Sequence, residues 1–334
     1  MIKTLLNPAK YPDKPENIKF VQTHISNVFI SKNYVYKIKK PVNFGFLDFT
    51  TLEKRKFYCE QEIILNSRLS PEIYIKVVPV IFYKNDYFFN EFVDKGETVD
   101  YAVVMKRINE ENLLKNKLIN NSLQIQDFKI IADHLYKFHE KYPATFSDAT
   151  ENSSIEMLKF TTDENFSQTE KYINITINQL QFNRIKTFTN EFYKKEKDLF
   201  YNRIKTQKIK ECHGDLHLEH IGIENGKPFF LDCIEFNNRF RIIDVANEIA
   251  FLSMDLDFNG YTDYSQKFID YYIEFSKDRD ILKLLNFYKI YRAYVRGKVT
   301  SFLLDDPNIE ENEKNSIINK AKKYFTLAYN YLDN

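Results

Sequence analysis

The sequence predicts an α+β protein of two lobes: a small β-rich lobe over residues 1–105 and a larger, mainly helical lobe over residues 106–334. Three observations predict this fold class. Hydrophobic residues alternate with a period of two in several short segments of the first hundred residues, as they do in half-buried strands. Beyond residue 109 they recur every three or four positions, as they do on one face of a helix. A chain of 334 residues also has the length of about two domains.

The β-rich lobe is expected to hold strands on both sides of one helix. Strands are predicted at residues 17–23, 26–31, 34–39, 73–83, 87–90 and 101–108. The third of these alternates most clearly and carries Lys37 and Lys39 on one face. Thr50 and Glu53 form a capping-box pattern, which predicts a helix over residues 51–69.

The second lobe is expected to be helical around one patch of short strands. Helices are predicted at residues 125–138, 176–207, 240–257, 262–278, 281–304 and 310–332. Residues 141–168 are polar and lack a clear period, so we expect irregular structure there. Short strands are expected over residues 208–232, around Gly214 and a hairpin signal at Asn225 and Gly226.

Composition excludes several classes of function. A net charge of +1 provides no general attraction for nucleic acid or an anionic membrane, and no apolar run approaches the roughly 18 residues of a membrane span. The 7 glycines form neither a Walker P-loop nor a G-x-G-x-x-G motif, so any phosphate binding must use another device. The 3 scattered cysteines cannot build a disulfide framework, and the first residues lack an apolar signal core. We therefore expect a cytoplasmic protein with reduced thiols.

Titratable residues concentrate in the segment H-G-D-L-H-L-E-H over residues 213–220, which is followed by D-C-I-E over residues 232–235. Such a cluster between strands is a candidate catalytic site. One interpretation is a metal hydrolase, because the spacing H-x3-H-x2-H would place His213 and His217 on one helical face, with His220 nearby. Gly214 and the β-rich flanks argue against a helix at this point.

The second interpretation is phosphoryl transfer, because the sequence resembles the aminoglycoside phosphotransferase and protein-kinase-like superfamily. H-G-D matches the start of the catalytic-loop motif H-[GR]-D-x-x-x-x-N, and Asp232 follows Asp215 by about 17 residues, as the metal-binding aspartate of kinases does. The phrases THISNVFI, YKIKKPVNFGFLDF, HGDLHLEHI and DCIEFN are similar to a bacterial subgroup of predicted small-molecule kinases. Many of its members carry a further P-loop kinase domain, so the resemblance covers the kinase-like half alone.

This resemblance implies a bilobal protein-kinase-like fold and assigns roles to single residues. Asp215 is the implied catalytic base and Asp232 the implied Mg²⁺ ligand, whereas His213 is expected to be architectural. In the first lobe, Lys37 would hold the α- and β-phosphates of ATP, with Lys39 as the alternative.

Two more residues of the first lobe take part in this assignment. Glu62 would orient the lysine, with Glu60 as the alternative, and Met105 stands in the hinge that would bind adenine.

Two positions depart from the kinase pattern. His220 replaces the asparagine that supplies a second metal contact, and a histidine is a poor ligand for Mg²⁺. Either the second metal contact is lost, or a softer ion such as Mn²⁺ binds, or Glu219 or Glu235 supplies the oxygen. The turn before Ser26 lacks the glycines of a kinase phosphate loop, so Ser26 and backbone N–H groups would contact phosphate instead.

The sequence thus predicts an ATP-dependent kinase that uses Mg²⁺ or Mn²⁺ and phosphorylates a hydroxyl of a small molecule, without nucleic-acid or membrane partners. Its acceptor and its oligomeric state are left open. Four arginines could line an anionic acceptor pocket, although a helix-surface role is the ordinary interpretation of any one: Arg239, Arg241, Arg292 and Arg296. The departure at His220 also leaves a nucleotide-binding pseudokinase as an alternative, beside the metal hydrolase.

Overall fold

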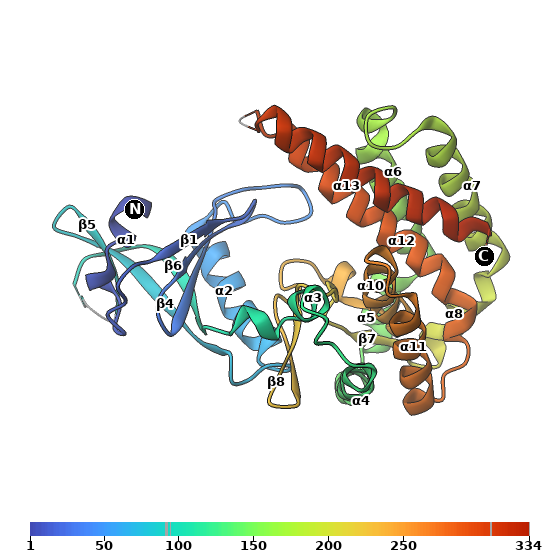
Figure 1. The fold of residues 1–334 in the computed structure, drawn as a ribbon, viewed down its shortest axis with the longest axis horizontal. Coiled ribbons are helices and arrows are strands. Elements are labelled where there is room, and N and C mark those ends of the chain that lie inside the picture. The colour runs from blue at the N-terminus through green and yellow to red at the C-terminus, as the bar shows by residue number, and fades with distance from the viewer. Residues whose placement is uncertain (91–92, 94, 308, 334) are drawn as a thin grey trace. The chain divides into compact units, whose positions relative to one another are not determined.

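The computed structural model describes residues 1–90, 93, 95–307 and 309–333, and the chain forms two compact units (Figure 1). The first unit consists of residues 1–120, 220–225 and 229–238, and the second of residues 121–219, 226–228 and 239–334. The segment that begins at residue 220 therefore belongs with the amino-terminal part of the chain. The lobe boundary after residue 105 stays a prediction.

The first unit is built on an antiparallel sheet with the strand order β1-β2-β3-β6-β4-β5. The strands are β1 (Lys19–Gln22), β2 (Ser26–Ile30), β3 (Tyr34–Lys39), β4 (Tyr74–Tyr83), β5 (Asp86–Phe89) and β6 (Glu97–Lys106). These strands confirm the sequence prediction, except that β6 begins at Glu97 rather than near residue 101. The first residues of β6, which are mostly polar, pair with β4. Pairing with a strand distant in sequence therefore extends β6 beyond its apolar part.

Side chains alternate across this sheet, and the two faces carry different kinds of residue. On one face Tyr36 and Ile38 lie in a buried cluster that also includes Leu5 and Tyr11, residues of the amino-terminal segment with α1 (Ile2–Leu5) and η1 (Pro8–Lys10). The other face carries Lys37 and Lys39.

The expected helix of the first unit is α2 (Leu52–Asn66), which packs on β4 and β6. It begins at Thr51, whose side chain accepts the Lys54 N–H. The cap is therefore one residue later than the Thr50 and Glu53 pattern predicts. Buried contacts among Cys59, Tyr74, Val103 and Phe229 join the helix to the sheet and to the returning segment. That segment contains β8 (Ile221–Glu224) and β9 (Lys227–Phe230), and the unit also holds η2 (Glu110–Asn112) and α3 (Leu114–Ile119).

The second unit is mainly helical (Figure 1). Its elements are α4 (Ile125–Lys141), α5 (Phe146–Ser153), α6 (Ile155–Thr169), η3 (Glu170–Tyr172), α7 (Gln179–Lys195), α8 (Lys197–Lys205), β7 (Ile209–Glu211), α9 (Asn238–Arg241), β10 (Ile242–Asp244), α10 (Val245–Phe258), α11 (Thr262–Ser276), α12 (Ile281–Phe302), η4 (Leu303–Asp305), α13 (Glu311–Asn330) and η5 (Tyr331–Asp333). Helix α10 is buried along most of its length and packs on α11 and α12, and α13 covers α12. The strands β7 and β10 pair antiparallel beside the start of α10.

Three sequence predictions for this unit are wrong. The helix predicted over 240–257 begins only at Val245, because residues 242–244 pair with β7 as strand β10. Residues 141–168 were expected to be irregular, yet they form α5 and α6, which begin at side-chain caps from Thr145 and Ser154. Contacts distant in sequence, such as Phe166 against Tyr294, stabilise α6 although its own pattern is weak. The helix predicted over 176–207 is divided, because α7 ends at Lys195 and α8 begins after Glu196.

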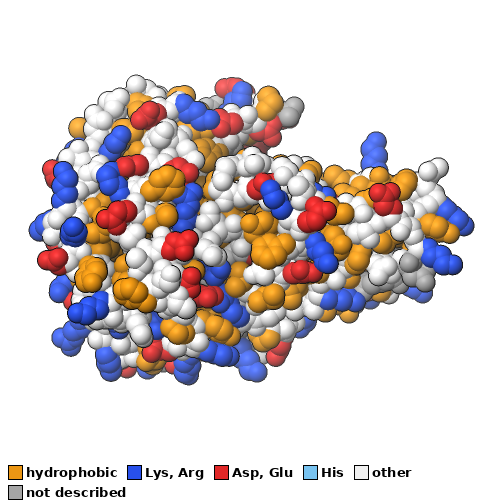
Figure 2. Space-filling view, turned by 180° about the vertical axis from the view of Figure 1, so that it is seen from behind, with side chains coloured by type: hydrophobic (Ala, Val, Ile, Leu, Met, Phe, Trp, Pro, Cys, Tyr) orange, Lys and Arg blue, Asp and Glu red, His pale blue; other side chains and the backbone are white. Residues whose placement is uncertain are grey.

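The surface agrees with the near-zero net charge. On the face in Figure 2, basic and acidic side chains are interspersed, and hydrophobic side chains lie among them in small groups. In the described part of the chain, no helix combines the length and the apolar character that crossing a membrane requires.

Candidate active site

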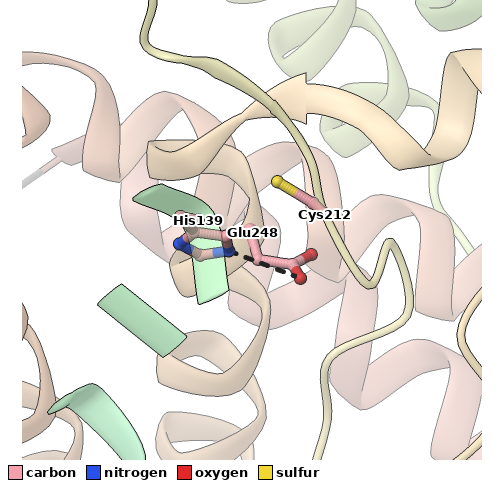
Figure 3. A group of neighbouring side chains, drawn as sticks. All are labelled: His139, Cys212 and Glu248. Atoms are coloured by element: carbon pink, nitrogen blue, oxygen red, sulfur yellow. Dashed lines mark ion pairs between the residues drawn. The ribbon is translucent and has the colours of Figure 1, made fainter. Parts of the chain in front are cut away.

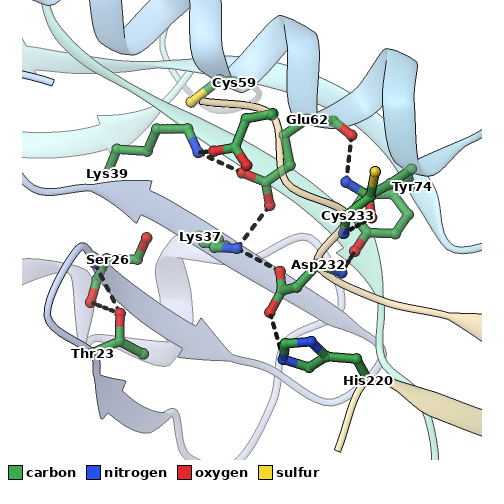
Figure 4. A network of polar contacts seen from close by, with 12 residues as sticks. Thr23, Ser26, Lys37, Lys39, Cys59, Glu62, Tyr74, His220, Asp232 and Cys233 are labelled. Carbon is green, nitrogen blue, oxygen red and sulfur yellow. Dashed lines mark hydrogen bonds and ion pairs between the residues drawn. The ribbon is translucent and has the colours of Figure 1, made fainter. Parts of the chain in front are cut away.

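Three charged side chains of the first unit meet below the sheet, on the face that carries Lys37 (Figure 4). The Lys37 ammonium on β3 lies 2.9 Å from Glu62 Oε1 on α2 and 2.6 Å from Asp232 Oδ1 in the segment after β9. The side chains of Lys37 and Glu62 are 14% and 1% exposed, whereas that of Asp232 is 45% exposed. One lysine thus joins a strand, a helix and a returning loop, and the loop carboxylate remains open to solvent.

A second lysine of the same strand completes the network. The Lys39 ammonium is buried and lies 2.6 Å from Glu62 Oε2, and it also donates to Glu235. Glu62 therefore lies between the two lysines and contacts one with each oxygen. By contrast, Glu60, the alternative partner, is half exposed and faces Lys56 at 3.8 Å.

The charges in this network explain the protonation of its members. Burial alone would raise the pKa of the Asp232 carboxyl, but Lys37 and then His220 outweigh it and hold that pKa below its usual range. Burial also acts against ionisation of Glu62, and Lys37 and Lys39 lower the pKa of this carboxyl below its ordinary value. Two ammonium groups thus face the carboxylates of Glu62 and Asp232. Glu235 lies in the same network, and burial raises the pKa of its carboxyl in spite of the Lys39 ammonium beside it.

The backbone around Asp232 is held in place by side chains of the first unit. The Asp232 N–H donates to the Tyr74 hydroxyl at 2.9 Å, and the Cys233 N–H donates to Asn66 Oδ1 at 2.8 Å. Asp232 itself has φ +59°, in the left-handed region, which a non-glycine residue occupies only where its surroundings fix it. These bonds hold the backbone that carries the Asp232 carboxylate.

Two further predicted site residues lie at the border of this network. His220 Nε2 is 3.9 Å from Asp232 Oδ2, so His220 faces the carboxylate oxygen that Lys37 leaves open (Figure 4). Ser26, at the start of β2, has a buried hydroxyl without a hydrogen-bond partner among the described residues, and the Asn27 Oδ1 atom beside it is in the same condition. Buried polar atoms of this kind are usually satisfied by a ligand or by water. The predicted hinge residue Met105 lies near the end of β6, opposite Val35.

The catalytic-loop motif belongs to the second unit and contains no helix between residues 213 and 219. His213 is buried, and its Nδ1 accepts the Asp215 N–H at 3.2 Å. His217 Nδ1 accepts the Glu219 N–H at 3.3 Å in the same manner. The metal-hydrolase interpretation required His213 and His217 on one helical face, and the loop does not supply that geometry.

Glu248 of α10 is hydrogen-bonded to the backbone of this loop. Its two carboxylate oxygens accept the N–H groups of His213, at 2.6 Å, and of Gly214, at 3.0 Å. Gly214 has φ +88°, where a side chain would be strained. His139 on α4 lies 4.0 Å from Glu248 (Figure 3). Its other ring nitrogen is hydrogen-bonded to the Tyr272 hydroxyl at 2.6 Å.

The buried group in Figure 3 also includes Cys212, and the donor atoms of His139, Cys212 and Glu248 lie within 4.8 Å of one another. Three such donors could hold a metal ion. Because both Glu248 oxygens already accept backbone bonds, we interpret the group as a support of the loop over residues 213–219.

Comparisons with known proteins identify the fold. The chain is similar over 97% of its length to a choline/ethanolamine kinase family protein from Mesorhizobium loti (TM-score 0.51, 10% identity, 96% of that chain). It is similar over 99% of its length to the choline kinase of Cryptosporidium parvum (TM-score 0.58, 12% identity, 94% of that chain). The chain has the fold of the choline and ethanolamine kinases. The ethanolamine kinase of Plasmodium vivax shares this kinase-like fold over 93% of the chain and 81% of its own (TM-score 0.50, 14% identity).

These likenesses confirm the α+β, protein-kinase-like fold that the sequence resemblance implied. No family model matches the sequence. Uncharacterised proteins of Mycobacterium bovis and Mycobacterium tuberculosis are 30% identical over 279 residues, which make up 83% of this chain and 53% of theirs. The chain with the kinase-like fold therefore spans about half the length of the curated relatives it matches.

The kinase-like fold brings together most of the predicted site residues of the first unit, and Asp215 lies in the second. Sequence reasoning missed the role of Glu248. A carboxylate in the first turn of an apolar helix was the available signal, because a buried acid requires partners. It also missed that Lys39 and Glu235 are partners, which no local pattern indicates.

Proposed function

We propose that this chain is an ATP-dependent phosphotransferase that moves the γ-phosphoryl group to a hydroxyl of a small molecule. The observation that carries the proposal is the contact of Lys37 with both Glu62 and Asp232, at 2.9 and 2.6 Å. Kinases use a lysine held by a helix glutamate for phosphate binding and an aspartate for the metal ion. The kinase names of the structural neighbours support the same class of reaction.

In the proposed site, nucleotide phosphates are bound by groups other than a glycine-rich loop. Lys37 holds the α- and β-phosphates, and Glu62 fixes the position of its ammonium. The unpartnered Ser26 hydroxyl and nearby backbone N–H groups provide donors for phosphate oxygens. Met105, close to the end of β6, contacts the adenine.

The donors beside Lys37 fit a divalent cation. Asp232 offers a carboxylate oxygen, and His220 offers a ring nitrogen 3.9 Å away. Mg²⁺ would use the carboxylate of Asp232, whereas Mn²⁺ could use both donors. Bound there, the metal ion would neutralise charge on the β- and γ-phosphates. Lys37 must give up its contact with Asp232 Oδ1 for the metal, and Glu62 keeps the ammonium close when it does so.

Asp215 acts as the catalytic base. It accepts the proton of the acceptor hydroxyl as the phosphoryl group moves in line. The bonds from Glu248 to the His213 and Gly214 backbones fix the loop that carries Asp215, so the carboxylate keeps one position.

Two variants test the proposal. Asp215→Asn is expected to lower turnover by about 10³-fold or more while Mg-ATP binding stays nearly unchanged. Asp232→Ala is expected to abolish metal-dependent nucleotide binding in titration calorimetry. Glu60→Gln is the matched control, since Glu60 is half exposed and outside the network. If Asp232→Ala leaves nucleotide affinity unchanged, Asp232 is not the metal ligand and the proposed site is wrong.

His220 motivates a second candidate function, a nucleotide-binding pseudokinase. Its ring faces Asp232 where kinases have an asparagine, and a charged imidazole there would compete with a metal ion. An ATP-consumption assay over a panel of hydroxylated metabolites, with Mg²⁺ and with Mn²⁺, separates the two functions. Nucleotide binding without transfer in either metal would favour the scaffold.

A further inference from the structure

Arg296 of α12 lies close to the proposed catalytic base within the second unit. Its Nη1 atom is 3.5 Å from His217 Nε2, and the same nitrogen of His217 is 3.5 Å from Asp215 Oδ2. The His217 Nδ1 atom accepts the Glu219 N–H, so a proton on the neutral ring would be on Nε2. Nε2 thus lies between the Asp215 carboxylate and the Arg296 guanidinium.

The guanidinium of Arg296 has few partners. Its Nε atom is buried without a hydrogen-bond partner, and no carboxylate in the described ranges forms an ion pair with Arg296. The Tyr324 ring lies 5.6 Å from the guanidinium carbon. Burial acts to lower the pKa of Arg296, but Tyr324, Asp215 and Asp255 outweigh burial and hold that pKa above its usual range. The buried Nε donor is costly to leave unpaired, and an anion that binds the guanidinium would satisfy it.

Arg292, one turn earlier on the same helix, shows the contrast. Its Nε donates to Asn247 Oδ1 at 2.7 Å and its Nη1 donates to the Gly214 carbonyl at 3.0 Å, so it supports the catalytic loop. Arg292 is buried, and the expected helix-surface role is wrong for it. The helix thus presents one arginine whose donors are used and one whose donors are available beside Asp215.

We propose that Arg296 binds an anionic oxygen group of the phosphoryl acceptor, so that the acceptor is a hydroxylated acid, carrying a carboxylate or a phosphate ester, and not an amino alcohol. The proposal rests on the proposed function. A guanidinium presents a planar fork of N–H donors that matches either group. An acidic acceptor would otherwise be repelled by Asp215 and by the nucleotide phosphates, and the arginine offsets this repulsion.

A charge-matched acceptor panel tests the proposal with the full chain. Glycerate, gluconate and glycerol 3-phosphate are compared with glycerol and sorbitol and with ethanolamine and glucosamine, and phosphorylated products are detected by mass spectrometry. We expect transfer to acids, and we expect Arg296→Gln to lower kcat/KM for the acid by about 10²-fold while a neutral analogue changes by no more than about threefold. Arg296→Lys should recover part of the loss. Lys283→Gln, an exposed position on the same helix, is the control.

The outcomes distinguish this inference from the proposed function. Transfer to neutral or amino acceptors in preference to acids, or an equal loss of kcat for all acceptors in Arg296→Gln, overturns the inference and leaves the kinase assignment intact. If the chain binds Mg-ATP without transfer, thermal stabilisation by the acids in the presence of Mg-ADP is measured instead. Stabilisation that Arg296→Gln abolishes supports an anion site, and its absence in the wild type overturns the inference. Loss of nucleotide binding altogether contradicts the proposed function itself.

Discussion

The Lys39 ammonium lies 2.6 Å from Glu62 Oε2, and the side chains of Lys39 and Glu62 are each only 1% exposed. The other oxygen of Glu62 contacts Lys37. In an isolated ion pair, the group that stays behind has no partner when the other group moves to a ligand. Glu62 would keep its contact with Lys39 if Lys37 moved to a bound phosphate, as the proposed function requires, so its buried carboxylate would still have a cation beside it. Glu235 is the other partner of Lys39, which ties the segment of Asp232 to β3.

Lys39→Met is therefore expected to destabilise the protein by about 3–5 kcal/mol, because it leaves the buried Glu235 carboxylate without its cation. Chemical denaturation of the variant and the wild type measures this change. The double variant Lys39→Met/Glu235→Gln should recover part of the loss, since it removes the uncompensated charge as well. Lys56→Met is the control, because its ion pair with Glu60 is exposed. A loss as small as that of the control would show that the pair contributes no more than a surface ion pair.

The sequence predicts the strands and the helix of the first unit because alternation and capping are local signals. It also places Lys37, Glu62 and Asp232 in kinase order, which motif resemblance supplies. It does not predict α6, whose weak pattern is stabilised by Phe166 against Tyr294. Partners such as Lys39 and Glu235 are 196 residues apart in sequence, and only the folded chain brings them together.

Glu248→Gln tests the support of the catalytic loop without any assumption about activity. The glutamine amide offers one oxygen to two N–H donors, so either His213 or Gly214 loses its acceptor. We expect faster hydrogen exchange at one of these two backbone amides, by about 10-fold or more, because the lost bond to a charged group is worth about 1.5–3 kcal/mol. Asn247→Ala is not a suitable control, because Asn247 accepts from Arg292. Glu191→Gln, at an exposed position of α7, is suitable. Unchanged protection of both amides would contradict this role of Glu248.

Lys298 gives the protein a specific dependence of stability on pH. This buried ammonium donates to the amide oxygens of Asn165, at 2.6 Å, and Gln168, at 2.7 Å. Burial outweighs the attraction of Glu164 and lowers the pKa of Lys298 from 10.5 to about 8. Between these two pH values the unfolded chain binds more protons than the folded one, so the free energy of unfolding increases as pH rises.

The expected slope from this residue is at most about 1.4 kcal/mol per pH unit, from about pH 8 to pH 10. It is measured as the difference in unfolding free energy between the wild type and Lys298→Met, which cancels the contributions of the tyrosines. Over this range the unfolding free energy of the wild type should increase relative to that of Lys298→Met, and below pH 7 the difference should stay constant. Lys137→Met, at an exposed site on α4, should give a flat difference. A flat difference for Lys298→Met as well would mean that Lys298 keeps its ordinary pKa.

Gly222 of β8 lies directly against the ring of Phe229 on β9. A Cβ atom added to this glycine would stand 2.1 Å from the ring carbon Cζ, far inside van der Waals contact. The ring is buried and packs with Cys59, Tyr74 and Val103, so it has little room to move. Gly222→Ala is therefore expected to destabilise the protein by about 1–3 kcal/mol through overpacking, which thermal denaturation measures. Phe229→Leu in the same chain should restore part of the stability of Gly222→Ala, because the smaller side chain frees the space that the new methyl group needs. If the two substitutions were simply additive, the ring would not be the cause of the loss.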